Sequence, residues 1–268
     1  MFGRQALLDA LQQIGNNLEK DITIYLIGGC AMTFMGQKVS TKDIDVVFSS
    51  LKDLELFIEA AKKSGFFALK DLAEEYKTLG TWIVIRNLDG MRFDLFNRIV
   101  CNALEINDRV MSRARKFLRF GRLDVLLTSP EDIFLFKGMT ERKGDLDDMR
   151  VLAEGGLQWS IVKEECMKQE KRRIWETFLA DRLIELKKTY GIDSPIIREL
   201  IASADTELIK NLFRRIVQAG NDTFDKIAAS IKEKYGYSEH WTRKELSKVV
   251  KARALKVKKR GRRNFYSI

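Results

Sequence analysis

The order of hydrophobic and polar residues changes from a helical to an extended pattern early in the chain. Residues 4–19 repeat their apolar positions every three or four residues, which predicts an opening helix. Residues 22–27, ITIYLI, form a β-branched and aromatic run of strand length. Polar and apolar positions then alternate through 41–48, TKDIDVVF, as in a strand with one buried face. These patterns predict a helix followed by two strands of one sheet.

Further elements complete the predicted sheet domain. Residues 51–64 repeat apolar positions at helical spacing and end at Gly65, a residue type that commonly ends a helix. Residues 81–86 and 91–96 have strand composition, and the Asp-Gly pair before residue 91 predicts a hairpin turn between them. The other elements expected before residue 129 are a helix at 104–114 and a strand pair at 116–120 and 123–128.

Helical patterns dominate the second half of the chain. Ser129-Pro130 predicts a helix start, because a capping serine precedes a proline at the first helical position. One long helix is predicted at 158–190 and another near 205–218. The last segment predicts helices at 222–235 and 242–253, then a hairpin of 254–258 with 264–267, which is the order of a winged helix. The predicted organisation is therefore a sheet domain at 1–128, a helical region at 129–220 and a basic winged helix at 221–268.

Candidate chemistry gathers where the first two strands meet. Gly28 and Gly29 follow the first strand and allow a tight turn at which bare backbone can approach a ligand. The helix after them would point its N–H groups toward that turn, which suits a phosphate. In the second strand, Thr41, Asp43 and Asp45 lie on one face because side chains alternate. Two carboxylates beside a glycine turn are hard oxygen ligands, and they predict a Mg²⁺ site.

The joint spacing of these residues resembles the signature of the DNA polymerase β-like nucleotidyltransferase superfamily. The resemblance implies an α+β core, a mixed sheet with helices, that binds an NTP. It implies that Asp43 and Asp45 hold two Mg²⁺ ions, with Mn²⁺ as the alternative, and that a third carboxylate on a later strand completes the set. Asp94 in the run FDLF is the candidate for that third ligand. These three aspartates are therefore the predicted catalytic and metal-binding residues.

The resemblance also implies that the Gly-Gly turn binds the nucleotide. It implies that Gly28, Gly29 and Thr41 contact the phosphates of the NTP. Many members of the superfamily have Gly-Ser at this position, whereas this chain has Gly-Gly followed by Cys30. A serine that would contact phosphate is therefore absent, although subfamilies with Gly-Gly are active.

A second block of residues follows the helix that starts at residue 130. Lys137, Arg142, Asp145 and Asp148 resemble, with slightly shorter spacing, a motif of the abortive-infection type nucleotidyltransferase toxins. The resemblance implies that Lys137 and Asp148 belong to the nucleotide site, because an ammonium is a good point charge against a triphosphate. It implies an RNA acceptor, with a tRNA 3′ end as one example, and an antitoxin as a partner of the protein.

Composition narrows the remaining classes of function. No apolar run approaches the roughly 20 residues of a membrane span, so no membrane partner is expected. The three cysteines are odd in number and lack ligand spacing, which indicates a reducing, cytoplasmic environment. The one histidine, His240, excludes a His-rich metal site and a His-based triad. A metal in this protein would therefore be held by carboxylates.

The excess of positive over negative charge lies entirely in the last segment of the chain. Residues 230–268 contain 13 Lys or Arg and three acids, which accounts for the whole net charge of +10. This asymmetry predicts a polyanionic partner for the segment, such as a nucleic acid. The resemblance to the toxins favours RNA over DNA, and the charge alone does not decide between them. The residues expected to contact it lie at the tip of the predicted hairpin: Lys258, Lys259, Arg260, Arg262 and Arg263.

The sequence therefore predicts a Mg²⁺-dependent enzyme that transfers NMP from an NTP to an acceptor, with RNA as the favoured acceptor. A second hypothesis keeps this chemistry but gives the acceptor as a small molecule or a protein hydroxyl. A third is a regulator without catalytic activity, which binds nucleic acid and retains the nucleotidyltransferase core as a scaffold.

Overall fold

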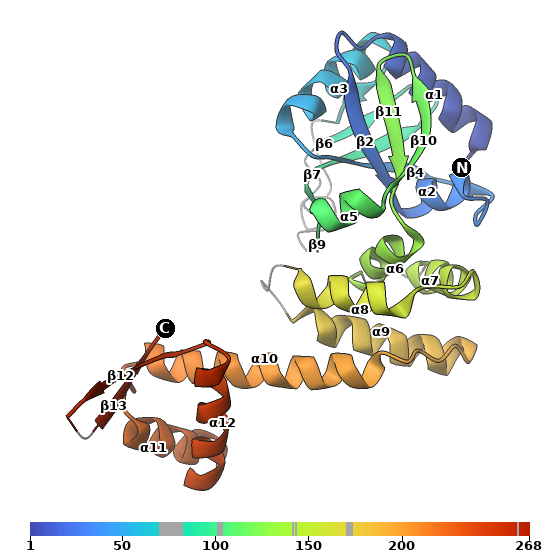
Figure 1. Ribbon diagram of the computed structural model, residues 1–268. Coiled ribbons are helices and arrows are strands. Elements are labelled where there is room, and N and C mark those ends of the chain that lie inside the picture. Colours follow the sequence, from blue (N-terminus) through green and yellow to red (C-terminus); the bar gives the residue numbers. More distant parts are fainter. Residues whose placement is uncertain (70–82, 101–103, 141, 143, 170–173, 262) are drawn as a thin grey trace. The chain divides into compact units, whose positions relative to one another are not determined.

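The computed structural model describes residues 1–69, 83–100, 104–140, 142, 144–169, 174–261 and 263–268. These residues form two compact units, Met1–Leu200 and Ile201–Ile268 (Figure 1). The division of the first unit at residue 128 stays a prediction. In the ranges described, no helix combines the length and the apolar character that crossing a membrane requires.

A seven-stranded mixed sheet organises the first unit, in the order β10, β11, β2, β4, β7, β6, β5 (Figure 1). The pairs β11–β2 and β4–β7 are parallel and the other pairs are antiparallel. The predicted mixed sheet with helices is therefore confirmed. Its strands are β2 (Ile22–Ile27), β4 (Asp43–Phe48), β5 (Phe67–Ala68), β6 (Ile83–Arg86), β7 (Arg92–Asn97), β10 (Arg115–Phe120) and β11 (Leu123–Leu127). Two short pairs lie outside it, β1 (Phe2–Gly3) with β3 (Ser40–Thr41) and β8 (Ile99–Val100) with β9 (Leu104–Glu105).

Alternation along the central strands separates the two faces of the sheet. Ile44 and Val46 of β4 belong to the main hydrophobic core, which also contains residues of α1 (Arg4–Asn16) and α3 (Leu51–Lys63). Val47 points to the other face, where it joins a smaller apolar cluster. Because side chains alternate, Asp43 and Asp45 share this second face with Val47. The α1 and α3 helices thus cover one face and leave the aspartates on the other.

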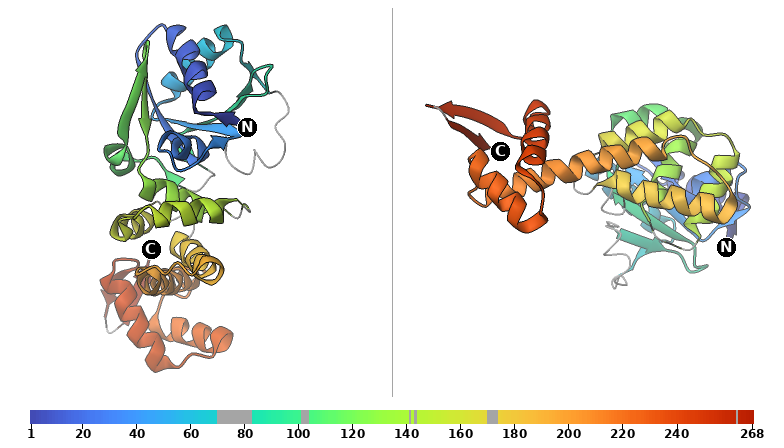
Figure 2. Two further views of the ribbon diagram at one scale, coloured as in Figure 1. Left: turned by 90° about the vertical axis from the view of Figure 1, so that its right-hand side faces the viewer. Right: turned by 90° about the horizontal axis from the view of Figure 1, so that it is seen from below.

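Four helices of the first unit follow the sheet and pack on one another. They are α6 (Pro130–Gly138), α7 (Asp145–Glu154), α8 (Trp159–Lys168) and α9 (Trp175–Tyr190). In Figures 1 and 2 they form a layer beside the ends of the strands. Ser129 caps α6 by accepting a hydrogen bond from the Asp132 N–H, and Pro130 is its first residue, as predicted. Phe134 of α6 packs edge to face on Trp159 of α8, with ring centroids 5.3 Å apart.

Three predicted helices have different bounds in the structure. The helix expected at 104–114 is shorter, α5 (Asp108–Arg113), because Asn107 caps it through the N–H groups of Arg109 and Val110. The helix expected at 158–190 is two helices, α8 and α9. The start of the helix expected near 205–218 is earlier, since α10 is Ile197–Gln218.

The described residues of the second unit contain most of α10, two further helices and a hairpin. These are α11 (Phe224–Tyr235), α12 (Glu239–Lys251), β12 (Lys256–Arg260) and β13 (Arg263–Ser267). Phe265 of β13 also bridges to Thr223, just before α11. The helix predicted at 242–253 starts earlier in the structure, because Ser238 accepts the capping bond from the Trp241 N–H and Thr242 is buried inside the helix. A core of its own holds the unit together, with Phe213, Ile227 and Leu246 among its members.

Candidate active site

The three predicted catalytic aspartates lie on two adjacent parallel strands. In the register of β4 and β7, Asp45 is opposite Asp94, and Asp43 is opposite Arg92. Asp94 is buried, with 5% of its surface exposed, whereas Asp43 and Asp45 are half-buried. Parallel pairing aligns the two strands in the same direction, and this brings two acids that are far apart in sequence to one place on the sheet.

Arg92 binds two of the three acids. Its guanidinium forms ion pairs with Asp43 and with Asp94, the latter at 3.0 Å between Nε and Oδ1. Arg92 is two residues before Asp94 on β7, so both side chains point to the same face. One cation of the chain therefore supplies positive charge to this acidic group.

Burial raises the pKa of Asp45 and of Asp94 above the usual range of a carboxyl. For Asp94 the second cause is the negative charge of Asp45, and Arg92 opposes both effects. For Asp45, burial is followed by the lowering effect of Lys137 and the raising effect of Asp43. For both acids, the loss of contact with water on burial is therefore the main cause of the raised pKa.

The chemistry of this group fits a divalent cation, but its present arrangement does not form a metal site. Carboxylate oxygens are the ligands that Mg²⁺ prefers, and the raised pKa values indicate a place where added positive charge is favourable. In the described part of the chain, however, no three acidic, histidine or cysteine side chains are grouped so that they could hold a metal ion. The Arg92 guanidinium occupies oxygens of Asp43 and Asp94 instead.

The two glycines are needed because side chains of the neighbouring strands lie against them. They open α2 (Gly28–Phe34) directly after β2. Gly28 has a φ of +61°, and a Cβ there would lie 2.5 Å from Oδ2 of Asp45. A Cβ on Gly29 would lie 2.8 Å from the Thr41 hydroxyl oxygen. Thr41 itself is not on the aspartate strand but on β3, and its hydroxyl donates to the Asp43 carbonyl at 3.0 Å.

Lys137 and Asp148 meet in one cluster of ion pairs. The Lys137 ammonium binds Asp145 and also Asp148, the latter at 2.9 Å. Lys38 binds both oxygens of Asp148, at 2.7 and 3.0 Å. Burial tends to raise the pKa of Asp148, but the two lysines outweigh it and leave this pKa below its usual value. Lys38 has no recognisable motif around it, and only the folded arrangement identifies it.

A cleft joins the aspartates to this cluster. Its volume is about 300 Å³, and its walls include Gly29, Asp43, Asp45, Lys38 and Lys137. Asp94 is not among the residues that line it, because it lies buried beside Asp45.

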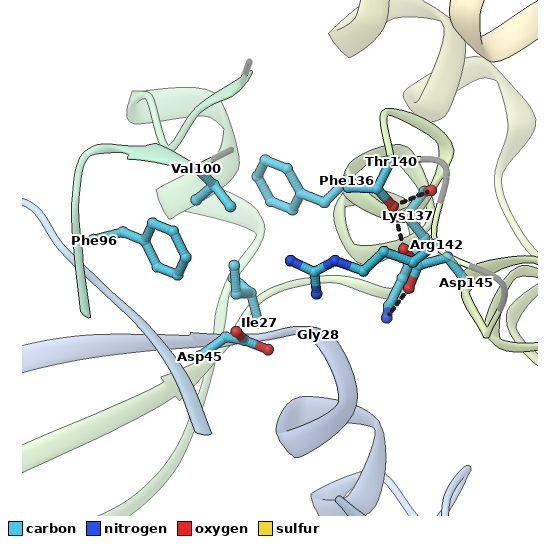
Figure 3. Close-up of a pocket in the computed structure, with 10 residues that line it drawn as sticks. All are labelled: Ile27, Gly28, Asp45, Phe96, Val100, Phe136, Lys137, Thr140, Arg142 and Asp145. Carbon is cyan, nitrogen blue, oxygen red and sulfur yellow. Dashed lines mark hydrogen bonds and ion pairs between the residues drawn. The ribbon is translucent and has the colours of Figure 1, made fainter. Parts of the chain in front are cut away.

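A smaller adjoining pocket of about 40 Å³ shares Asp45 and Lys137 with the cleft and has a more apolar wall (Figure 3). Figure 3 shows Phe96 and Phe136 on one side of this pocket, with the Arg142 side chain extending toward Asp45. The apolar wall could not be predicted from the sequence, because its side chains come from three separate stretches of the chain: Ile27, Phe96 with Val100, and Phe136.

The residues predicted to contact nucleic acid lie in the second unit. Lys258, Lys259 and Arg260 are exposed on β12, and Arg263 is exposed on β13. Arg262 lies outside the described residues. No acid follows Glu245 in the sequence, so the hairpin has cationic side chains and none that are anionic.

Paired carboxylates on a mixed sheet, set against a Gly-Gly turn and faced by lysines across a cleft, are the features of a nucleotidyl-transferring enzyme. The chain belongs to the family described as nucleotidyl transferase of unknown function (DUF2204), whose model matches residues 7–218. The prediction of a nucleotidyltransferase is therefore confirmed. The basic hairpin and the two helices before it lie beyond the matched residues.

Two solved structures from H. pylori are similar to this chain at low identity. One, a candidate nucleotidyltransferase, is 14% identical over 76% of this chain and 91% of its own, with a TM-score of 0.39. The other, JHP933 from Helicobacter pylori, is 14% identical over 94% of this chain and 97% of its own, with a TM-score of 0.36. No curated protein matches the chain.

Proposed function

We propose that this nucleotidyl transferase uses Mg²⁺ to move an NMP group from an NTP to a hydroxyl of RNA, with pyrophosphate as the leaving group. The observation that carries the proposal is the parallel register that brings Asp45 beside Asp94, against the Gly28 backbone. In this role Asp43, Asp45 and Asp94 would hold the metal, and Mn²⁺ could take its place. The ion would neutralise charge that develops on the reacting phosphate and would lower the pKa of the acceptor hydroxyl.

Metal binding requires a change at Arg92. Its guanidinium pairs with Asp43 and Asp94, so those oxygens must exchange their partner before they can coordinate an ion. A rotation of the Arg92 side chain to another rotamer would release these oxygens. Until then Arg92 provides Asp43 and Asp94 with a partner of opposite charge.

The two adjoining cavities support one orientation of the nucleotide. Lys137 lies where the cleft and the apolar pocket meet, and it favours the phosphates there because its charge is opposite. Phe136 is half-buried and lines the other pocket, where its ring gives a face on which a base can pack. We therefore place the triphosphate in the cleft over Gly29 and the base at the side of the cleft that adjoins Phe136.

The second unit supports a nucleic acid as the acceptor. Its element order, a helix, a short bridge, two helices and a hairpin, supports the winged-helix interpretation. The cations of β12 and β13 are exposed, and in the described residues of this unit no acid is paired with them. Such a cationic surface attracts the phosphates of a nucleic acid whatever its nucleotide sequence. It therefore suits an RNA that is recognised through its phosphate backbone.

A labelling experiment tests the proposal. The protein is incubated with Mg²⁺ and each α-³²P-labelled NTP, with total RNA or with protein alone, and the products are separated on denaturing gels. We expect label in RNA. Asp45→Asn and Asp94→Asn should each reduce it at least about 100-fold, because the metal accounts for several kcal/mol of transition-state stabilisation. Asp89→Asn is the matched control, since Asp89 is exposed in the β6–β7 turn.

The outcomes separate the hypotheses. Undiminished labelling by Asp45→Asn would remove the metal assignment. Label in the protein band without RNA would favour a protein hydroxyl as the acceptor. No label with any NTP, together with salt-sensitive nucleic-acid binding, would favour the regulator without catalytic activity.

A further inference from the structure

Two lysines share one carboxylate above the Gly-Gly turn, and they are held to different degrees. Lys137 binds two acids and has 16% of its side chain exposed, whereas Lys38 binds Asp148 alone and has 34% exposed. Lys38 is therefore the cation of this cluster that can leave its partner at the lower cost.

The Lys38 ammonium also lies beside the place that the phosphates of the nucleotide would occupy. This group is 3.8 Å from the position that a Cβ on Gly29 would occupy, and Lys38 lines the same cleft as Asp43 and Asp45. It follows α2 and precedes β3, so the loop that carries it is joined directly to the turn. An ammonium at this place can bind a phosphate oxygen by a charge-assisted hydrogen bond, the same kind of bond that it now makes to Asp148.

Asp148 has a different position in this cluster. Both of its oxygens are already bound by ammonium groups, at 2.7 to 3.0 Å. It lies in the first turn of α7 and is 7% exposed, so it is held firmly. A carboxylate in this position would repel a triphosphate rather than bind it. Its pairing with the lysines is what connects it to the site.

We propose that Lys38 is a second triphosphate-binding cation beside Lys137, and that Asp148 is a positioning residue that holds both lysines until the phosphates arrive. On binding, Lys38 exchanges Asp148 for a phosphate oxygen, while Lys137 stays held by Asp145. This inference rests on the proposed function, and it replaces the sequence-based expectation that Asp148 contacts the nucleotide.

A purely structural reading of the same contacts is that Lys38 only ties its loop to α7. The two readings differ in what inorganic tripolyphosphate does. If Lys38 only supports the fold, its loss lowers the melting temperature but leaves tripolyphosphate affinity unchanged. If it binds phosphate, affinity falls even where the fold is intact.

Calorimetric titration of the full-length protein with inorganic tripolyphosphate, with and without Mg²⁺, distinguishes them. We expect Lys38→Gln to weaken binding about 10- to 100-fold, the worth of one hydrogen bond to a charged group. Lys38→Arg keeps a cation that binds phosphate and should stay within about fivefold of the natural protein. Lys62→Gln is the matched control. Lys62 is also paired with an acid, Glu59 at 2.6 Å, but this pair lies on the exposed surface of α3.

Asp148→Asn tests the second half of the proposal. It should bind tripolyphosphate within about threefold of the natural protein, because Asp148 makes no contact with the phosphates. In NMP transfer, KM for the NTP should stay close to normal while kcat falls about tenfold, since Asp148 no longer holds the two lysine side chains in position. Melting temperatures of all variants show whether a change reflects unfolding.

Two results would overturn the proposal. Unchanged tripolyphosphate affinity in Lys38→Gln would mean that Lys38 does not bind phosphate. A loss of tenfold or more in a folded Asp148→Asn protein would mean that Asp148 contacts the ligand. Binding needs no turnover, so a protein that binds tripolyphosphate through Lys38 but labels no acceptor would refute the proposed function and leave this inference standing.

Discussion

Replacement of Gly28 by alanine should separate the stability of the fold from the geometry of the acids. Gly28 has a φ of +61°, in the left-handed region, and the added Cβ would lie 2.5 Å from Oδ2 of Asp45. Gly90 has a φ of +82° in the β6–β7 turn, and a Cβ there meets nothing within 4 Å. The Gly90→Ala variant therefore has the same backbone strain without the contact, and it is the matched control.

The expected cost in stability is similar for the two variants. A left-handed conformation costs an L-residue about 1–2 kcal/mol, so each melting temperature should fall by about 2–8 °C. At Gly28 the clash adds up to about 1.5 kcal/mol, because the carboxylate of Asp45 can relieve it by turning away from its preferred rotamer. The stability data alone should therefore distinguish the two glycines only weakly.

The expected cost in activity differs greatly. To reach ordinary contact distance the Asp45 carboxylate must move by about 1 Å, and a displacement of that size can reduce turnover about 100-fold. We expect a loss of this order in kcat/KM for Gly28→Ala, measured with labelled NTP, and a change below about threefold for Gly90→Ala. Equal activity of the two variants at 25 °C, with both folded, would refute the view that Asp45 needs the position that Gly28 allows.

Two further predictions concern charge elsewhere in the chain. Burial alone raises the pKa of Glu165, but hydrogen bonds from Arg109, Asn107 and Arg113 lower it to about 2, from 4.5. Because the folded pKa is the lower one, its contribution, about 2 kcal/mol after allowance for solvent screening, is present above pH 4.5 and is lost as the pH falls toward 2. Urea midpoints of Glu165→Gln should therefore depend less on pH over this range than those of the natural protein. In the second unit, replacing the four described hairpin cations of the predicted contact set by glutamine should reduce the slope of log affinity for RNA against log salt by about 3–4, and an unchanged slope would remove the hairpin from the interface.

The sheet and its acids could be predicted because their signals are local. Alternation in β4 and β7 fixes the face of Asp45 and Asp94, and the register then brings them together. The strand pair β10–β11 was recognisable for the same reason. Helix bounds were less certain, since a cap such as Asn107 or Ser238 competes with a periodic pattern that continues past it.

Contacts between distant segments could not be predicted in this way. Lys38 and Asp148 are separated by 110 positions, and no spacing rule connects a loop after α2 with the first turn of α7. Thr41 was expected on the same strand as Asp43. The strand is interrupted between these two residues, and Thr41 pairs with β1 instead. Arg92 could have been noticed, because it shares a face with Asp94, yet its partner Asp43 comes from the neighbouring strand.

Most charged groups of the cleft are already held in ion pairs before any ligand arrives. Arg92 pairs with Asp43 and Asp94, and the lysines pair with Asp145 and Asp148. A metal ion is positive, like Arg92, and a triphosphate is negative, like Asp145 and Asp148. Together the two ligands can replace these partners, with positive charge against the aspartates and negative charge against the lysines. Binding of either ligand alone would replace only one of the two sets of ion pairs and leave the displaced group without a partner. A buried charge without a partner is costly. The ion pairs that stabilise the free protein therefore favour binding of the metal and the nucleotide together over binding of either one.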